Sequence, residues 1–142
     1  MGFPDSIERT VRIERPVDDV WAAITTADGL AAWFGQRAEI DLRVGGLATL
    51  TWDEGHVAHL RIERIEPPAV FGYTWGIYGL PDGDPRRTYV EFTLVPDGAA
   101  TTLTVVESGF AQLEPDRHDS SVSGNTEGWR SELDELVAYL HG

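Results

Sequence analysis

The chain has 142 residues, a length that fits a single domain over residues 1–142. It carries 24 acidic side chains against 11 basic ones and a formal net charge of -13, which argues against nucleic acid or a membrane surface as a partner. It contains no cysteine, and all the basic residues apart from histidine are arginines, so disulfides, a cysteine nucleophile, Schiff-base chemistry and a P-loop lysine are excluded. With no signal-like segment and no apolar run of about 18 residues, we expect a cytoplasmic protein.

Residues 7–16 have the alternating pattern of a half-buried strand. One face of this strand carries Ile7, Arg9, Val11 and Ile13. The spacing of apolar residues changes to that of a helix from Val17 onwards, and Gly29 interrupts it. We therefore predict two short helices after the first strand, with a bend near residues 27–29.

Residues 36–110 alternate with a period of two, and turn residues divide them into six strands. The first of these strands is expected over residues 38–44, with Ala38, Ile40, Leu42 and Val44 on one face and a tight turn at Gly45 and Gly46. Further along, the inward positions change parity between Ile62 and Ile65, which indicates a β-bulge.

The C-terminal residues 124–142 have the pattern of an amphipathic helix. Its apolar face carries Trp129, Leu133, Leu136, Val137 and Leu140, whereas Arg130, Glu132, Asp134 and Glu135 are expected to face water. We interpret the serines at 120, 121 and 123 as a polar run at the start of this helix, and His118 as a solvated loop residue. Six consecutive antiparallel strands have one hydrophobic face to cover, and this helix is long enough to cover it. The expected fold class is therefore α+β, with a curved antiparallel sheet around one long C-terminal helix.

This order of elements, together with several strings, resembles the START-like (SRPBCC) superfamily and, within it, proteins similar to the C-terminal domain of the heat shock protein 90 ATPase activator. The strings are RPVDDVWAAITTADGLAAWF, the GG that follows, IEPPAVFGYTW, VEFTLVPDGAATTLTVVESGF and GWRSELDELVAYL. The resemblance implies a helix-grip fold of six to seven strands, with a cavity between the sheet and the last helix that holds apolar molecules. Some members of the superfamily cyclise or hydrolyse polyketide-type substrates.

The candidate ligand-binding residues are mostly aromatic, because large rings beside a cavity offer apolar area and, in Tyr and Trp, a polar group. They are Trp33, Phe34, Trp52, His59, Tyr73, Trp75, Phe92, Glu107, Phe110 and Trp129. We expect Trp33 and Phe34 at one mouth of the cavity and Phe110 at the other rim. The alternative for each ring is that it fills the core.

Glu107 continues the inward register of Leu103 and Val105, so its carboxylate is expected beside the cavity as an acid, a base or a hydrogen-bond acceptor. It is the one weak catalytic candidate. The alternative is a bulge near Ser108 and Gly109 that turns the side chain outward.

No metal or other cofactor is expected. His56 and His59 are three positions apart, and on a strand such side chains point to opposite faces. Arg86 and Arg87 could attract a carboxylated ligand to the rim of the cavity, or form a plain surface pair.

The function predicted from these residues and the resemblance is the binding of an apolar or amphipathic small molecule. Two alternatives remain, an enzyme of the polyketide cyclase or hydrolase kind and a protein-interaction module of the co-chaperone type. A homodimer through an edge strand is also compatible with the sequence.

Overall fold

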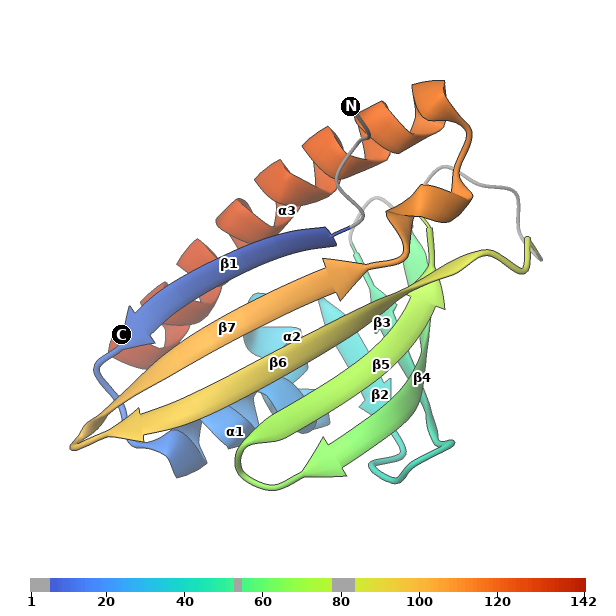
Figure 1. The fold of residues 1–142 in the computed structure, drawn as a ribbon. Helices are drawn as coiled ribbons and strands as arrows, with labels where there is room; N and C mark the ends of the chain where they lie inside the picture. The colour runs from blue at the N-terminus through green and yellow to red at the C-terminus, as the bar shows by residue number, and fades with distance from the viewer. Residues whose placement is uncertain (1–5, 53–54, 78–83) are drawn as a thin grey trace.

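The computed structural model describes residues 6–52, 55–77 and 84–142 (Figure 1). The elements are β1 (Ser6–Ile13), α1 (Val17–Thr25), α2 (Ala27–Trp33), β2 (Arg37–Ile40), β3 (Leu47–Thr51), β4 (Val57–Glu66), β5 (Val70–Gly76), β6 (Arg87–Asp97), β7 (Ala100–Ser108), the 3₁₀ helix η1 (Phe110–Gln112) and α3 (Pro115–His141). The strands form one 7-stranded sheet in the order β1-β7-β6-β5-β4-β3-β2, and each neighbouring pair is antiparallel. This order of elements and the α+β helix-grip fold confirm the prediction.

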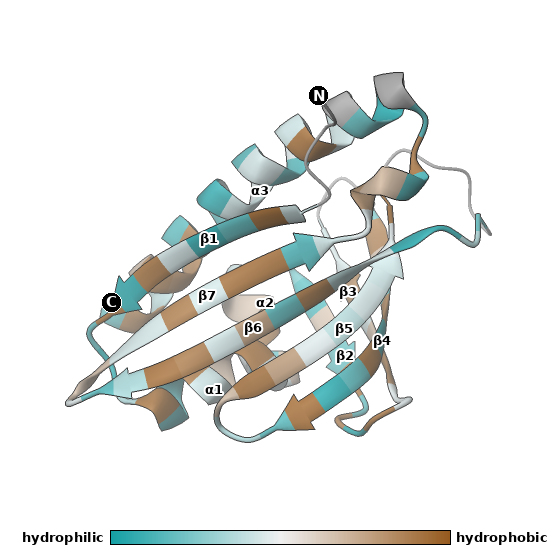
Figure 2. Ribbon diagram, viewed as in Figure 1, coloured by the Kyte–Doolittle hydropathy of each residue, from teal (hydrophilic) through white to brown (hydrophobic). Residues whose placement is uncertain are grey.

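The helices cover the concave face of the sheet. In Figure 1, α3 runs along β1 and β7, while α1 and α2 lie under the middle of the sheet, so the last helix shares the covering with the first two. Every second residue is buried over residues 87–94 of β6 and 101–108 of β7. In Figure 2, brown bands are separated by pale and teal ones along these two strands. The core therefore lies between this face and the three helices.

The bend between α1 and α2 lies at Thr26, close to its predicted place. The Thr26 hydroxyl accepts a hydrogen bond from the Gly29 amide at 3.0 Å, which caps α2, and donates one to the Ala22 carbonyl at 2.7 Å. A Cβ atom on Gly29 would lie 2.5 Å from the Ala22 carbonyl oxygen. The glycine thus permits the close contact between the two helices.

Replacing Thr26 with alanine should lower the free energy of unfolding by about 1 kcal/mol, because the first turn of α2 loses its side-chain cap. Urea unfolding followed by circular dichroism measures the change. Thr26→Ser keeps the hydroxyl and is the matched control, expected close to the wild type. An alanine variant as stable as the serine variant would contradict this role of the hydroxyl.

The strand expected over residues 38–44 ends at Ile40. Leu42 and Val44 are 43% and 63% exposed, so their predicted inward positions are wrong. The cause is the turn at Gly45 (φ 83°), whose amide donates to the Ile62 carbonyl at 2.7 Å, while the Ile62 amide donates to the Gly46 carbonyl at 2.9 Å. The turn therefore binds to β4 beside the bulge, which the register shift between Ile62 and Arg64 confirms.

Helix α3 starts at Pro115, well before the predicted start at residue 124. A proline suits the first turn of a helix, because its φ is already helical and the amide proton that it lacks would have no partner within the helix at that position. The serines at 120, 121 and 123 lie inside the helix. His118 is only 4% exposed, so its interpretation as a solvated loop residue is wrong. At the other end, the His141 ring accepts from the Glu14 amide at 2.9 Å, which fixes the end of α3 to the segment after β1.

Candidate functional site

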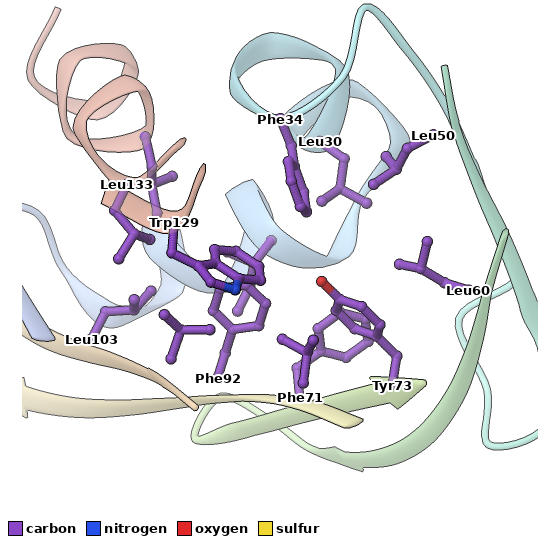
Figure 3. Packing of buried hydrophobic residues seen from close by; sticks show 14 of the residues in the cluster. Leu30, Phe34, Leu50, Leu60, Phe71, Tyr73, Phe92, Leu103, Trp129 and Leu133 are labelled. Atoms are coloured by element: carbon purple, nitrogen blue, oxygen red, sulfur yellow. The ribbon is translucent and has the colours of Figure 1, made fainter. Parts of the chain in front are cut away.

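Aromatic rings from α2, β5, β6, α3 and the end of β3 meet between the sheet and α3. We call them the aromatic cluster, which consists of Trp33, Phe34, Trp52, Phe71, Tyr73, Trp75, Phe92 and Trp129. Phe34 is at its centre, with ring centroids 5.7 Å from Trp52, 5.8 Å from Trp75 and 5.6 Å from Trp129. Figure 3 shows Phe34, Tyr73, Phe92 and Trp129 around one interior region. The structure thus brings together seven of the ten predicted binding residues.

Three predicted placements differ from the structure. His59 is exposed on β4, outside the cluster, and we remove it from the candidate site. Phe110 is fully buried in η1, so it does not form a rim. Trp33 and Phe34 are also buried and stack on each other at 4.7 Å, which places them in the interior and not at a mouth. The half-buried rings of the cluster are those of Trp52 and Trp75.

Glu107 points inward, as its register suggests, and its side chain is 1% exposed. Oε2 accepts hydrogen bonds from Trp75 Nε1 at 2.8 Å and from the Thr88 hydroxyl at 2.5 Å. Oε1 accepts from Asn125 Nδ2 at 2.9 Å and from Trp129 Nε1 at 2.9 Å. One carboxylate therefore joins β5, β6 and β7 to α3.

These four donors are all neutral, and together they occupy the two lone pairs of each Glu107 oxygen. Hydrogen bonds of this kind stabilise a buried carboxylate without a paired cation. With neither oxygen free to accept a proton from a substrate, the geometry favours a structural role for Glu107 over the catalytic role considered from the sequence.

Two of the four donors, Thr88 and Asn125, were not among the residues predicted from the sequence. Thr88 lies in the same inward register as Val90, and Asn125 precedes Trp129 by one helical turn. These spacings were a usable signal, because both residues follow from the same periodicity that placed Glu107 and Trp129.

Tyr73 has a buried hydroxyl in the interior. Its side chain is 1% exposed, and among the described residues the hydroxyl has no hydrogen-bond partner. Figure 3 shows this oxygen pointing away from β5 toward the side of Leu30 and Phe34. Burial, with the nearby carboxyl groups of Glu107 and Glu132, raises the pKa of Tyr73 well above its usual value. The hydroxyl is therefore a donor in an apolar region.

Glu132 does not face water as predicted. It is half-buried, and its Oε2 is buried without a hydrogen-bond partner in the described part of the chain. The error arises because Glu132 follows Trp129 by three residues, which places it on the flank of the apolar stripe. Burial, and to a smaller extent the charge of Glu135, raises the pKa of Glu132 to about 8. Near neutral pH this carboxyl group is mostly protonated.

The two arginines proposed at the rim are bound by the protein itself. Arg86 pairs with Asp84 and with Glu114, each at 2.9 Å, and lowers the pKa of Asp84 to about 2. Arg87 donates to the Thr74 carbonyl at 2.8 Å and to a carbonyl of β4 at 3.1 Å. The sequence also indicates a loop at this rim, GLPDGDPRR over residues 79–87, and its residues up to 83 lie outside the described residues.

The histidines near β4 are separate from each other, since His56 stacks on Trp52 with ring centroids 5.3 Å apart and His59 is exposed. Within residues 6–52, 55–77 and 84–142, no three His, Asp or Glu side chains gather as metal ligands. None of the helices described is both long and apolar enough to span a bilayer.

Comparison with known proteins agrees with this fold. A family model described as Activator of Hsp90 ATPase homolog 1-like protein matches residues 14–141. The chain is similar to the solved structure of protein MLL2253 from Mesorhizobium loti, with 26% identity, a TM-score of 0.81 and 96% of each chain covered. No curated protein sequence matches the chain significantly.

Two further similar structures have related names. DynU16, described as a putative protein in the dynemicin biosynthetic locus, has 28% identity and a TM-score of 0.81, and the alignment covers 97% of this chain and 48% of DynU16. CalU16 from Micromonospora echinospora has 28% identity and a TM-score of 0.74, with 95% and 75% covered. The family match over nearly the whole chain and the helix-grip fold support a ligand-binding domain in general terms. The chain belongs to the Activator of Hsp90 ATPase homolog 1-like family.

Proposed function

We propose that the protein binds an apolar or amphipathic small molecule between the concave face of the sheet and α3. The observation that carries this proposal is the pair of buried polar atoms, the Tyr73 hydroxyl and Glu132 Oε2, which have no partner among the described residues. Leaving such a group unpaired costs about 1–3 kcal/mol. A core that only had to pack would be more stable with phenylalanine at position 73 and an apolar residue at 132.

The aromatic cluster supplies the apolar contacts that such a ligand needs. Two of its rings, Trp75 and Trp129, are held in place by their hydrogen bonds to Glu107. A fixed pocket wall lowers the ordering cost of binding. The similar protein DynU16 belongs to a biosynthetic locus, which is consistent with a small-molecule ligand for the present chain.

Tyr73→Phe should weaken the binding of 2-naphthol, a planar apolar molecule with one hydroxyl group, by about fivefold, because one hydrogen bond of about 1 kcal/mol is lost. The same change should leave the free energy of unfolding equal or higher, since the hydroxyl has no partner within the described chain. Isothermal titration calorimetry gives the affinity. The indole N–H signals of Trp75 and Trp129 in NMR spectra locate the ligand.

Tyr89→Phe is the matched control, because Tyr89 lies on the outer face of β6 and donates to Glu91 at 2.8 Å. It should bind 2-naphthol like the wild type. Equal affinity of the Tyr73 and Tyr89 variants would count against contact between the ligand and Tyr73. A wild-type protein that shows no saturable binding would count against the proposed function itself.

A further inference from the structure

We propose that this interior site binds ligands whose buried polar group is a carbonyl oxygen, which accepts a hydrogen bond from Tyr73, and that it binds a ketone more tightly than the matching alcohol. The inference rests on the proposed function, since it names the class of molecule that is bound there. Its basis is the set of hydrogen bonds made by the polar side chains around the aromatic cluster.

Three indole N–H groups of the aromatic cluster already have acceptors within the protein. Trp75 Nε1 and Trp129 Nε1 donate to Glu107 at 2.8 Å and 2.9 Å. Trp33 Nε1 donates to the Ala23 carbonyl at 2.7 Å. These hydrogen bonds hold the rings in place, so the three N–H groups are not available to a ligand.

The side-chain acceptors beside the cluster are also engaged. The two oxygens of Glu107 receive four hydrogen bonds, which use the lone pairs of the carboxylate. The Thr88 hydroxyl donates to Glu107 at 2.5 Å and accepts from Trp75 Nε1 at 3.0 Å. A ligand proton would therefore have to compete with these internal hydrogen bonds for an acceptor.

The Tyr73 hydroxyl differs from these groups. It is buried and has no partner among the described residues, although a phenol hydroxyl can donate one hydrogen bond. The ring packs against other rings, with centroids 5.8 Å from Phe71 and 6.3 Å from Phe92. Figure 3 shows the oxygen pointing toward the side of Leu30 and Phe34. The surroundings of this donor are thus apolar, and an acceptor brought by a ligand would complete it.

A carbonyl group fits this arrangement better than a hydroxyl group does. A carbonyl oxygen only accepts, so one hydrogen bond from Tyr73 satisfies both partners. An alcohol that accepts the same bond brings its own proton, and leaving that buried donor unpaired costs a factor of about five or more in affinity. Glu132, the other side chain with an unpartnered oxygen, is mostly protonated near neutral pH, so it too can donate. The unpartnered groups therefore favour a ligand that brings an acceptor and no proton.

The test compares three probes of similar shape, 2-acetylnaphthalene, 1-(2-naphthyl)ethanol and 2-ethylnaphthalene, which carry a ketone, an alcohol and no polar group. Isothermal titration calorimetry of the full chain at neutral pH gives the affinities, with the protein in the syringe because the probes are sparingly soluble. The wild type should bind the ketone about fivefold more tightly than the alcohol. Tyr73→Phe should weaken ketone binding about fivefold and leave hydrocarbon binding within about twofold. Tyr89→Phe, the control on the outer face, should change neither affinity.

The carbonyl carbon of the ketone reports the hydrogen bond directly. With ¹³C at this position, the NMR signal of the bound ketone should move upfield in Tyr73→Phe relative to the wild type, because the hydrogen bond from Tyr73 withdraws electron density from the carbonyl carbon. A loss of affinity caused only by repacking of the rings would not remove this difference in the same way in the Tyr89→Phe control, which should keep the wild-type signal.

Equal losses of ketone and hydrocarbon binding in Tyr73→Phe, an unchanged ketone affinity, or an unmoved ¹³C signal would overturn the assignment to Tyr73. Alcohol binding as tight as ketone binding in the wild type would overturn the preference for carbonyl compounds. In each of these cases saturable binding of the probes would leave the proposed function standing. If neither these probes nor 2-naphthol bind to the folded wild type, the proposed function is wrong, and the inference with it.

Discussion

Glu107→Gln is expected to lower the free energy of unfolding by about 2 kcal/mol. Glutamine replaces one acceptor oxygen with an NH₂ donor, which must face either Trp75 and Thr88 or Asn125 and Trp129. A threonine hydroxyl or an asparagine amide can turn to accept, but an indole N–H only donates. With the NH₂ group toward Asn125 and Trp129, the buried Trp129 indole loses its acceptor. With the NH₂ group toward Trp75 and Thr88, the Trp75 indole keeps only the Thr88 hydroxyl as its acceptor, at 3.0 Å. In both orientations the remaining hydrogen bonds lose the strength that the charge gives them.

Urea unfolding measures this loss, and Glu91→Gln on the outer face of the sheet is its control. Glu91 binds Arg64 and Tyr89 near the surface, so its substitution should cost less than 1 kcal/mol. Hydrogen exchange adds a local measurement, because Glu107 also anchors the middle of α3 through Asn125 and Trp129. Relative to the wild type, Glu107→Gln should increase the exchange rates of amides 118–129 more than those of amides 133–140. A variant with wild-type stability and exchange would show that the four hydrogen bonds are not important.

The fold was predictable because it depends on periodicity. A period of two along β6 and β7 identified the inward residues, and the same alternation placed Glu107 in the interior. Periodicity gives the face of an element but not the atoms opposite to it. The donors to Glu107 come from three different elements, so its full coordination requires the three-dimensional structure.

The errors in the prediction lie where an element begins or ends, or at the border between two faces. Leu42 and Val44 continue the alternation of β2, but the turn at Gly45 binds to β4 and ends the pairing. Glu132 is polar and lies on the flank of the α3 stripe, where the periodicity does not distinguish solvent from interior. The Tyr73 hydroxyl has no partner among the described residues, and this was also beyond prediction, because the absence of a partner depends on all the neighbours of the group together.

Glu132 should make the protein less stable as the pH rises from about 5 to 9. Its pKa is about 8 in the folded protein against a usual value of 4.5, so the folded state holds this proton more tightly than the unfolded state does. Between these two pH values unfolding releases the proton, and the free energy of unfolding falls as the pH increases. Because Glu132 is only half-buried and partly screened by solvent, we expect a loss of about 2 kcal/mol, well below the full effect of the shift.

Glu132→Gln cannot titrate, so it should lack this part of the pH dependence and be more stable than the wild type at pH 9. Urea unfolding of both proteins at pH 5 and pH 9 gives the difference, in which the titration of groups common to both proteins cancels. Asp134→Asn removes an exposed carboxylate from the same helix and should keep the wild-type profile. Parallel profiles for the wild type and Glu132→Gln would mean that the carboxyl group of Glu132 is solvated, which would also remove the argument for its contact with a ligand.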